Sequence, residues 1–360
     1  MLMLKELGAR HTLRARPLFL KGFNMPADPL QAHVAKDFKN PSPLVSCRFD
    51  PLGRYVFAGT QSNKVVRWSL ADGKATEFGG HDSWVRGLAF AKTKDGDKDV
   101  LLMISGGYDG RVIIWNADAE TPEPIRKIDA HAGWVRALVV LPDQAHVVSC
   151  GNDNKVKLWR IADGMLVREF IGHESHVYNV ALHPDGKQLV SGDLKANLIH
   201  WDLDTGKQLR TFKSASLHKY DEGFWADIGG YRELAFSPDG KFLAGCGITN
   251  VTNAFAGVGN AAVAEFNWAE GKEVVVHLAK TAIQGNGWGM VWHPKNFLIG
   301  LSGGGGGGVL YFFKPAEKNE FHLFKLPGHA RDLALSPDAM TLASAGANGQ
   351  LVLTKLGPKA

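Results

Sequence analysis

Hydrophobic and polar residues alternate along short stretches of the chain, and turn-forming residues separate these stretches. Between residues 130 and 170 the alternating stretches cover 134–140, 146–150, 155–159 and 165–170, with Pro142, Asn152 and Gly164 in the turns between them. Short alternating stretches joined by such turns are typical of strands in an antiparallel meander. A four-stranded meander cannot bury both of its faces alone, so the pattern predicts that this sheet packs against other sheets.

The same unit recurs along the chain at a period of roughly 40–45 residues. Seven copies align through the residue that ends each third strand: Trp68, Trp115, Trp159, Trp201, Phe266, Phe312 and Thr354. The last copy lacks a fourth strand, whereas residues 32–38 precede the first copy and have no sheet of their own. We predict an all-β fold, a single seven-bladed β-propeller of four-stranded antiparallel blades, closed by this N-terminal strand. The propeller would span residues 31–358, after a basic, disordered segment at residues 1–30.

The repeats resemble the WD40 β-propeller family over roughly nine-tenths of the chain. The resemblance implies a buried, hydrogen-bonded tetrad of His, Ser or Thr, Asp and Trp in each regular blade. Two blades match fully, with His81, Ser105, Asp109 and Trp115, and with His131, Ser149, Asp153 and Trp159. Blade four has His173, Ser191 and Trp201 with Lys195 in the aspartate position, and blade seven has His329, Ser344, Asn348 and Thr354. Blades one, five and six depart further, with Ala58, Ser62, Asn260, Phe266 and Phe312 at tetrad positions, so we expect packing alone to hold them.

The resemblance also implies that the face carrying the loops between blades is the usual docking surface. Aligning the innermost strands on Leu88, Leu138, Leu182 and Leu234 predicts an arginine crown around the channel mouth, formed by Arg86, Arg136, Arg232 and Arg331. Blades one, four and six place Val45, Tyr178 and Trp288 in the same ring, and Trp84 and Trp134 lie nearby. Arginine and tryptophan are enriched in interface hot spots, and guanidinium groups suit carboxylates and phosphates. Alternatively, the arginines pair with Asp82, Glu174, Glu233 or Asp332, and the tryptophans pack beneath loops.

Insertions add residues to the same face at blades five and six. Residues 214–230 form a long predicted loop with the aromatic residues Tyr220, Phe224 and Trp225, and residues 248–260 form a second insertion. Six consecutive glycines at 303–308 occupy the matching loop of blade six. Long loops on a rigid scaffold often carry function, although these could also fill gaps left by the irregular tetrads.

Composition restricts the class of protein further. The chain has 360 residues, 45% of them hydrophobic, a net charge of +5 and three cysteines. These values favour a globular protein with reduced core thiols, and we expect a cytoplasmic location without a membrane span. The basic start of the chain could be a transit peptide, a disordered tail, or a segment before a true start at Met25.

Catalytic and cofactor motifs are lacking in the sequence. The glycine run has no Gly-Lys-Ser/Thr, no cysteine pair has zinc spacing, and no serine nucleophile elbow occurs, so we expect no catalytic residue, no metal and no cofactor. The leading hypothesis is a non-enzymatic scaffold, a monomeric propeller within a larger complex, that binds an acidic or phosphorylated protein segment. The alternative is a propeller enzyme or small-ligand binder that uses the central channel with residues 214–230 as a lid. RNA binding through Arg and Trp stacking is disfavoured by the modest charge.

Overall fold

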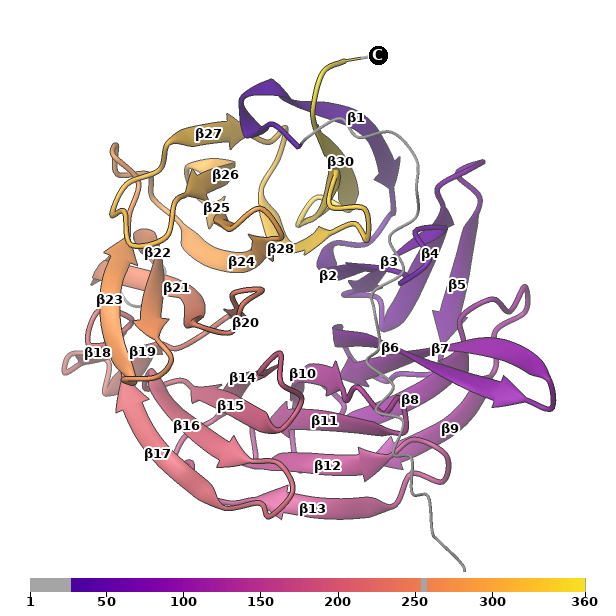
Figure 1. Ribbon diagram of the computed structural model, residues 1–360. Helices are drawn as coiled ribbons and strands as arrows, with labels where there is room; N and C mark the ends of the chain where they lie inside the picture. The colour runs from indigo at the N-terminus through magenta and orange to yellow at the C-terminus, as the bar shows by residue number, and fades with distance from the viewer. Residues whose placement is uncertain (1–26, 254–257, 360) are drawn as a thin grey trace, which may run out of the picture.

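The computed structural model of the protein describes residues 27–253 and 258–359. It contains seven four-stranded antiparallel sheets arranged as blades around a central axis (Figure 1). The predicted seven-bladed propeller is therefore confirmed. The predicted N-terminal segment lies almost wholly outside the described residues, including Met25.

Blades one to four follow the chain as simple meanders, with the first strand innermost. Blade one consists of β2 (Leu44–Phe49), β3 (Tyr55–Thr60), β4 (Lys64–Ser69) and β5 (Ala75–Gly79). Blade two consists of β6 (Val85–Asp95), β7 (Lys98–Gly107), β8 (Arg111–Asn116) and β9 (Pro124–Asp129). Blade three consists of β10 (Val135–Val140), β11 (His146–Gly151), β12 (Val156–Arg160) and β13 (Leu166–Phe170). Blade four consists of β14 (Val177–Leu182), β15 (Gln188–Asp193), β16 (Asn197–Asp202) and β17 (Gln208–Lys213).

The remaining blades include the insertion and the closing strand. A separate hairpin precedes blade five and consists of β18 (His218–Asp221) and β19 (Ala226–Gly229). Blade five consists of β20 (Glu233–Phe236), β21 (Phe242–Asn253), β22 (Val258–Asn267) and β23 (Lys272–His277). Blade six consists of β24 (Asn286–His293), β25 (Phe297–Gly304), β26 (Gly307–Phe313) and β27 (His322–Lys325). Blade seven consists of β28 (Ala330–Leu335), β29 (Thr341–Gly346), β30 (Gln350–Leu356) and, after the short 3₁₀ helix η1 (Pro29–Gln31), β1 (Ala32–Lys39).

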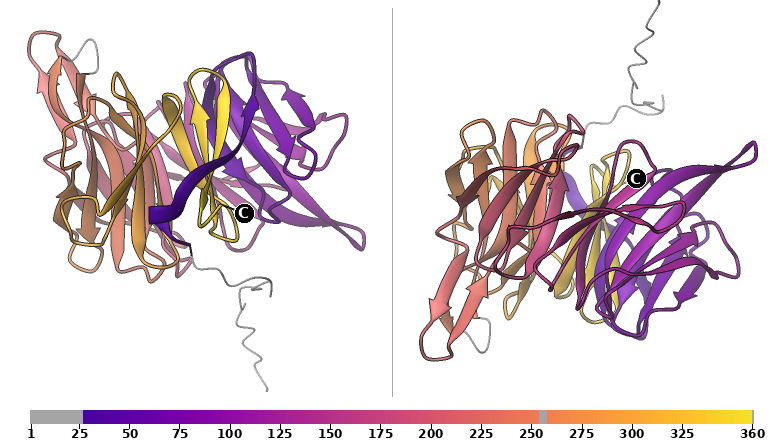
Figure 2. Two further views of the ribbon diagram at one scale, coloured as in Figure 1. Left: turned by 90° about the horizontal axis from the view of Figure 1, so that it is seen from above. Right: turned by 90° about the horizontal axis from the view of Figure 1, so that it is seen from below.

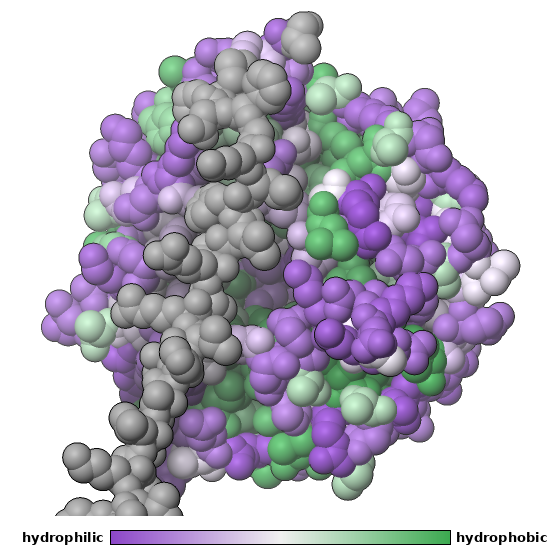
Figure 3. Space-filling model, turned by 45° about the vertical axis from the view of Figure 1, so that its right-hand side comes forward, coloured by the Kyte–Doolittle hydropathy of each residue, from purple (hydrophilic) through white to green (hydrophobic). Residues whose placement is uncertain are grey.

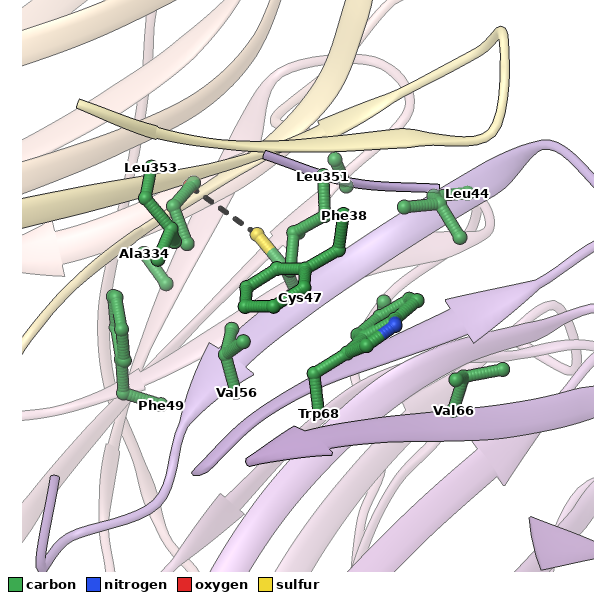
Figure 4. Packing of buried hydrophobic residues seen from close by; sticks show 13 residues of the cluster. Phe38, Leu44, Cys47, Phe49, Val56, Val66, Trp68, Ala334, Leu351 and Leu353 are labelled. Atoms are coloured by element: carbon green, nitrogen blue, oxygen red, sulfur yellow. Dashed lines mark hydrogen bonds between the residues drawn. The ribbon is translucent and has the colours of Figure 1, made fainter. Parts of the chain in front are cut away.

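The two ends of the described chain pair to close the ring. Strand β1 runs antiparallel to β30, from Ala32 opposite Leu356 to Lys39 opposite Gln350. This confirms the prediction that residues 32–38 complete the last blade. Behind the pair, Phe38 stacks on Trp68 of blade one with ring centroids 5.6 Å apart (Figure 4). The closing strand therefore also covers part of blade one.

The hydrophobic core is divided among the contacts between blades. Seven clusters of buried side chains occur, and each contains residues from two neighbouring blades. All three cysteines are free and buried. On the outer surface seen in Figure 3, hydrophilic residues cover most of the visible area and hydrophobic residues are scattered among them. Each blade is therefore stabilised mainly by its neighbours.

The two faces of the disc differ in the loops that they carry. We call top the face on which innermost strands begin and second strands turn into third strands. The β18–β19 hairpin rises from the top face at the rim of the disc, whereas the β6–β7 hairpin projects on the opposite side (Figure 2). The predicted irregular loop at residues 214–230 is thus wrong in detail, because its sequence pairs into a hairpin.

The tetrads hold the top of blades two, three and four. In blade three, Ser149 Oγ lies 2.8 Å from Trp159 Nε1 and 2.7 Å from His131 Nε2, and His131 Nδ1 lies 2.7 Å from Asp153. Blade two has the same hydrogen bonds among His81, Ser105, Asp109 and Trp115. These bonds satisfy polar side chains that lie between two blades and would otherwise be buried without partners.

Two predicted tetrad positions are wrong, and blade seven keeps its predicted positions without the hydrogen bonds. In blade four the tetrad is completed by Asp193 and not by the residue at position 195, which is a lysine. The Asp193 carboxylate lies 3.0 Å from His173 Nδ1. The turn is as long as the one in blade three, but the carboxylate comes from Asp193 at the end of β15 and not from the turn itself. In blade seven, Ser344 Oγ and Thr354 Oγ1 are buried without a hydrogen-bond partner, because threonine has no indole N–H to donate.

The other misplaced position is in blade six. There the residue equivalent to the tetrad tryptophan is Phe313 and not Phe312. Tyr311 pairs with Gly300, and Phe313 two residues later packs towards blade five. The glycine run before this strand obscures the register in the sequence.

Outer-strand arginines join neighbouring blades on the bottom face. Arg126, Arg168 and Arg210 follow one another at intervals of 42 residues, and each donates to two backbone carbonyls in a turn of the next blade. Arg168, for example, lies 2.8 Å from Leu203 O and 2.6 Å from Asp204 O. These outer-rim clamps supply donors to turn carbonyls that have no strand partner.

Replacing Trp159 with alanine should lower the free energy of unfolding by about 3–5 kcal/mol, because it removes a buried side chain and the Nε1 hydrogen bond to Ser149. Urea denaturation followed by circular dichroism measures this change. Trp225→Ala is the matched control, because Trp225 is 83% exposed. Equal denaturation midpoints for the two variants would contradict the structural role of the tetrad.

The tetrad aspartate should make stability depend on pH in the acid range. Burial opposes ionisation of Asp153, but the hydrogen bond from His131 outweighs this and lowers the pKa to about 2. A depressed folded-state pKa stabilises the fold above the unfolded value near 4, and this stabilisation disappears as the pH falls from about 4 to about 2.

We expect a loss of about 2 kcal/mol over this interval, measured by denaturation at successive pH values. Asp153→Ala should flatten that part of the profile, whereas Asp99→Ala, which changes an exposed aspartate on the β6–β7 hairpin, should leave it unchanged. A flat profile for the parent protein would disprove the assignment.

Candidate functional site

A β-bulge near the start of the innermost strands builds the ring of residues at the channel mouth. In β6 the pairing shifts between Val85 and Gly87, so that Arg86 is the extra residue. Corresponding shifts in the other innermost strands single out Val45, Arg136, Tyr178, Trp288 and Arg331. Arg232 lies directly before β20, and its N–H donates to Cys246 O at 2.8 Å. Because bulges re-aim side chains, the same backbone irregularity turns one residue of six blades towards the channel mouth, and Arg232 takes the equivalent place in blade five.

The bulges also correct the sequence alignment in blade four. Leu88 pairs with Ser105 and Leu138 with Ser149, and the residue that pairs with Ser191 is Val180. The alignment on Leu182 was therefore wrong by two residues. Tyr178 nevertheless occupies the expected place in the ring.

Aromatic rings separate the guanidinium groups of two crown arginines. The Arg136 guanidinium carbon lies 4.5 Å from the Trp134 ring centroid and 4.3 Å from that of Tyr178. The Arg232 guanidinium carbon lies 4.8 Å from the Tyr178 centroid and 5.3 Å from that of Trp288. A guanidinium held over rings by cation–π contacts still has its N–H edge available to an anion.

Tyr108 extends this row and was not identified from the sequence. Its ring is parallel to that of Trp134 with centroids 4.1 Å apart, and lies 6.0 Å from that of Trp84. Tyr108 directly precedes the tetrad aspartate Asp109, and this position always lies in the top-face turn of its blade. The position directly before the tetrad aspartate was therefore the sequence signal that could have identified Tyr108 as a top-face residue. We call the complete row the aromatic–guanidinium arc, formed by Trp84, Tyr108, Trp134, Arg136, Tyr178, Arg232 and Trp288.

The crown arginines have no carboxylate partner in the part of the chain that the structure describes. Their hydrogen bonds go to uncharged oxygens: Arg86 donates to the carbonyls of Val45 and Arg331, and Arg136 Nε donates to Asn152 Oδ1 at 2.8 Å. The Nε atom of Arg232 is buried and has no partner. None of the four arginines therefore forms a direct ion pair with a carboxylate in the described part of the chain.

The acids that could have paired with the crown are engaged elsewhere. Asp82 pairs with Arg111, and Glu233 and Asp332 pair with Arg48 at 3.1 and 2.9 Å. No described ion pair includes Glu174. The alternative that these acids pair directly with the crown arginines is therefore wrong for the described residues.

The environment of the crown disfavours its own positive charge. Burial lowers the pKa of Arg136, and the charges of Arg232 and Arg86 lower it further, against the opposing effect of two tyrosines. Burial likewise lowers the pKa of Arg331, and the charge of Arg86 adds to this effect. Arginine stays protonated in proteins, so these shifts indicate positive charges that are partly desolvated and repel one another, and a bound anion would offset both effects.

A small polar cavity of about 30 Å³ lies below the crown and is bordered by Arg48, Arg86, Arg136, Asn179, Glu233 and Asp332. Burial raises the pKa of Glu233, opposed by the charge of Arg48 and reinforced by that of Asp332. The Oδ2 atom of Asp332 accepts from Arg48 and from Cys47 N–H, whereas Oδ1 is buried without a partner. This internal ion cluster occupies the channel directly beneath the crown.

The inserted segments differ in how they relate to the crown. The aromatic residues Tyr220, Phe224 and Trp225 are all at least half exposed on the β18–β19 hairpin, at the rim and away from the channel mouth (Figure 2). Residues 248–260 extend the β21–β22 hairpin beside it, with 254–257 outside the described residues.

The glycine run fits closely against other loops. A side chain at Gly303 would lie 2.1 Å from Ala330 O, and one at Gly308 would lie 2.2 Å from Gly328 O. Only glycine allows the backbones to approach so closely, so these glycines serve packing.

The comparisons with known proteins agree with this architecture. The family model described as WD domain, G-beta repeat, matches residues 74–116, 122–160 and 164–202. Residues 74–202 of the chain therefore contain three WD repeats. Each matched repeat begins with the outermost strand of one blade and continues with three strands of the next. The same offset explains why the ring needs β1 for closure.

Several proteins are similar to this chain over part of their length. Protein groucho of Drosophila melanogaster is 31% identical over 135 residues, which are 36% of this chain and 18% of that protein. A ribosome biogenesis protein WDR12 homolog of Chlamydomonas reinhardtii is 30% identical over 145 residues, which are 36% of this chain and 32% of that protein. An uncharacterized WD repeat-containing protein of Schizosaccharomyces pombe is 24% identical over 185 residues, which are 48% of each. The chain thus spans less than half of each of these relatives.

Two further features of the chain bear on function. Within residues 27–253 and 258–359, no group of three His, Cys, Asp or Glu side chains is arranged to hold a metal ion. In the same residues, no helix has the length and apolar character needed to cross a membrane.

Proposed function

We propose that this protein is a non-enzymatic scaffold whose arginine crown binds an acidic or phosphorylated segment of a protein partner. The observation that carries the proposal is the set of four guanidinium groups without any carboxylate partner among the described residues. Carboxylates and phosphates accept from the N–H edge of a guanidinium, and bidentate pairing gives such contacts directional specificity.

The family supports a docking role. WD40 propellers typically mediate protein interactions, and three repeats of this chain match that family. The aromatic–guanidinium arc adds the residue types that are enriched in interface hot spots, with Trp84 and Trp134 about two-fifths exposed. An acidic segment with a nearby apolar or aromatic residue fits this combination best.

The competing channel hypothesis has weaker support. The ion cluster of Arg48, Glu233 and Asp332 uses the charged groups of the channel for one another. The hairpin expected to act as a lid stands at the rim, so closing the channel would require a large movement. The free, buried cysteines agree with our further proposal of a reducing compartment such as the cytoplasm.

Arg136→Ala should weaken the binding of a fluorescein-labelled peptide rich in Glu and phosphoserine by about tenfold or more, because a desolvated charged hydrogen bond is lost. Fluorescence anisotropy at several salt concentrations measures both the affinity and its salt dependence, and the variant should show the flatter dependence. Arg160→Ala is the control, because Arg160 is exposed and already paired with Asp163.

Comparison of the phosphoserine peptide with glutamate and glutamine versions separates phosphate from carboxylate recognition. Equal affinity for all three peptides would overturn the proposal. So would unchanged binding by a variant in which Arg86, Arg136, Arg232 and Arg331 are all replaced, provided that circular dichroism shows an intact fold.

A further inference from the structure

The β18–β19 hairpin is a rigid element that the propeller does not need for closure. A contact between His218 Nε2 and Asp227 Oδ1, 2.7 Å apart, joins the two strands of the hairpin. Lys195 of blade four lies 3.5 Å from the same carboxylate and joins the hairpin to that blade. Lys219 Nζ donates to Val251 O at 3.0 Å and anchors the hairpin to the extended β21. At the tip, Asp221 accepts from the N–H of Gly223 at 3.1 Å and fixes the turn.

The tip presents exposed aromatic residues beside an acid. Trp225 is 83% exposed and Tyr220 50%, and Glu222 lies between them, also exposed. Trp225 adopts a φ of 53°, a left-handed conformation that is unusual for a bulky side chain and is found where structure serves a function. The other nine tryptophans are either buried or part of the aromatic–guanidinium arc. Packing within its own chain therefore does not explain why a tryptophan stands at position 225.

The hairpin tip carries the groups that the crown arginines would bind, namely a carboxylate and aromatic rings. The crown has guanidinium groups without a direct carboxylate partner among the described residues, and Glu222 offers a carboxylate for their N–H edges. The arc ends in exposed aromatic faces, and Trp225 and Tyr220 offer rings that stack on guanidinium or aromatic partners. Both surfaces belong to the top face, but the hairpin stands at the rim and points away from the disc, so it does not cover the crown of its own chain (Figure 2).

One symmetry operation brings the two surfaces together in a pair of chains. Two discs can face each other across a two-fold axis that lies in the plane between them. This axis crosses the line from hairpin tip to crown at the midpoint of that line and is perpendicular to it. This axis exchanges the positions of tip and crown while turning one disc over onto the other. Each hairpin then meets the crown of the opposite copy, and both contacts form at once, as in an isologous dimer.

We propose that the occupant of the crown in the free protein is a second copy of this chain, whose hairpin tip inserts Glu222 and Trp225 among the crown arginines. The inference rests on the crown being an anion-binding surface, as proposed above. The dimer holds the crown closed, and an acidic partner segment opens it by competing for the same guanidinium groups. A partner segment must therefore bind the crown strongly enough to displace the second copy of the chain.

Analytical ultracentrifugation of the purified full chain over a range of concentrations tests the inference. The parent protein should show a concentration-dependent monomer–dimer equilibrium, and Glu222→Lys and Trp225→Ala should each raise the dimer dissociation constant about tenfold or more. Glu270→Lys is the matched control, because it changes the same exposed charge in a turn on the bottom face. A parent that is monomeric at every concentration, or a dimer indifferent to both hairpin variants, would overturn the inference.

A charge exchange tests the pairing itself. Arg232→Glu alone should weaken the dimer as Glu222→Lys does, whereas the double variant with both changes should recover most of the affinity. Failure of the double variant to recover would also overturn the proposed contact.

The same variants separate this inference from the proposed function. If Trp225→Ala binds the acidic peptide at least as tightly as the parent while remaining monomeric, both proposals are supported. If the peptide binds through Arg136 but the parent never dimerises, only the self-association is wrong. If a dimer forms through the hairpin but no acidic peptide binds or dissociates it, the proposed function fails and competition for the crown fails with it.

Discussion

Both faces of each sheet must be covered by a neighbouring sheet, and the rest of the structure depends on this constraint. A four-stranded blade has an apolar layer on either side, and the seven buried clusters all lie between two blades. A linear stack would leave two faces exposed, so the stack closes into a ring. The tetrads at the top and the outer-rim clamps at the bottom then supply polar contacts at the same boundaries.

Recognition is separated from this packing by the bulge in the innermost strands. The bulged residue faces the channel mouth, and its identity changes from Val45 to Arg136 to Trp288 while the strand pairing of the blade stays the same. The fold thus provides seven equivalent positions, and the sequence decides which carry charge. In this chain the charges lie beside aromatic rings, which hold the guanidinium groups in place while leaving their donors available.

Much of the architecture could be predicted from the sequence, because strand alternation and the repeat period are local properties. The closing strand was predictable for the same reason, since one copy lacked a strand and residues 32–38 had no sheet. Details that depend on turn geometry were not. Asp193 replaces the expected aspartate position because its side chain reaches His173 from the end of β15, and the glycine run hid the register of Phe313.

The candidate site was only partly predictable. The ring position of the four arginines followed from alignment, but their lack of ion pairs did not, because it depends on Arg48 attracting both Glu233 and Asp332 from other blades. Tyr108 was overlooked because its role comes from stacking between two neighbouring tryptophans, which no single repeat reveals. Contacts across blades are thus the information that a repeat pattern does not contain.

The pairing of β1 with β30 has a consequence for how the chain is made. Translation proceeds at about 5–20 residues per second, so β1 emerges tens of seconds before its partner exists. During that time β1 has no sheet to join, and blade one lacks the cover that Phe38 later gives to Trp68. A nascent chain of this kind must keep the unpaired edge of β1 from pairing with other chains until the last blade leaves the ribosome. The seam of the ring is therefore the place where chaperones have most to protect.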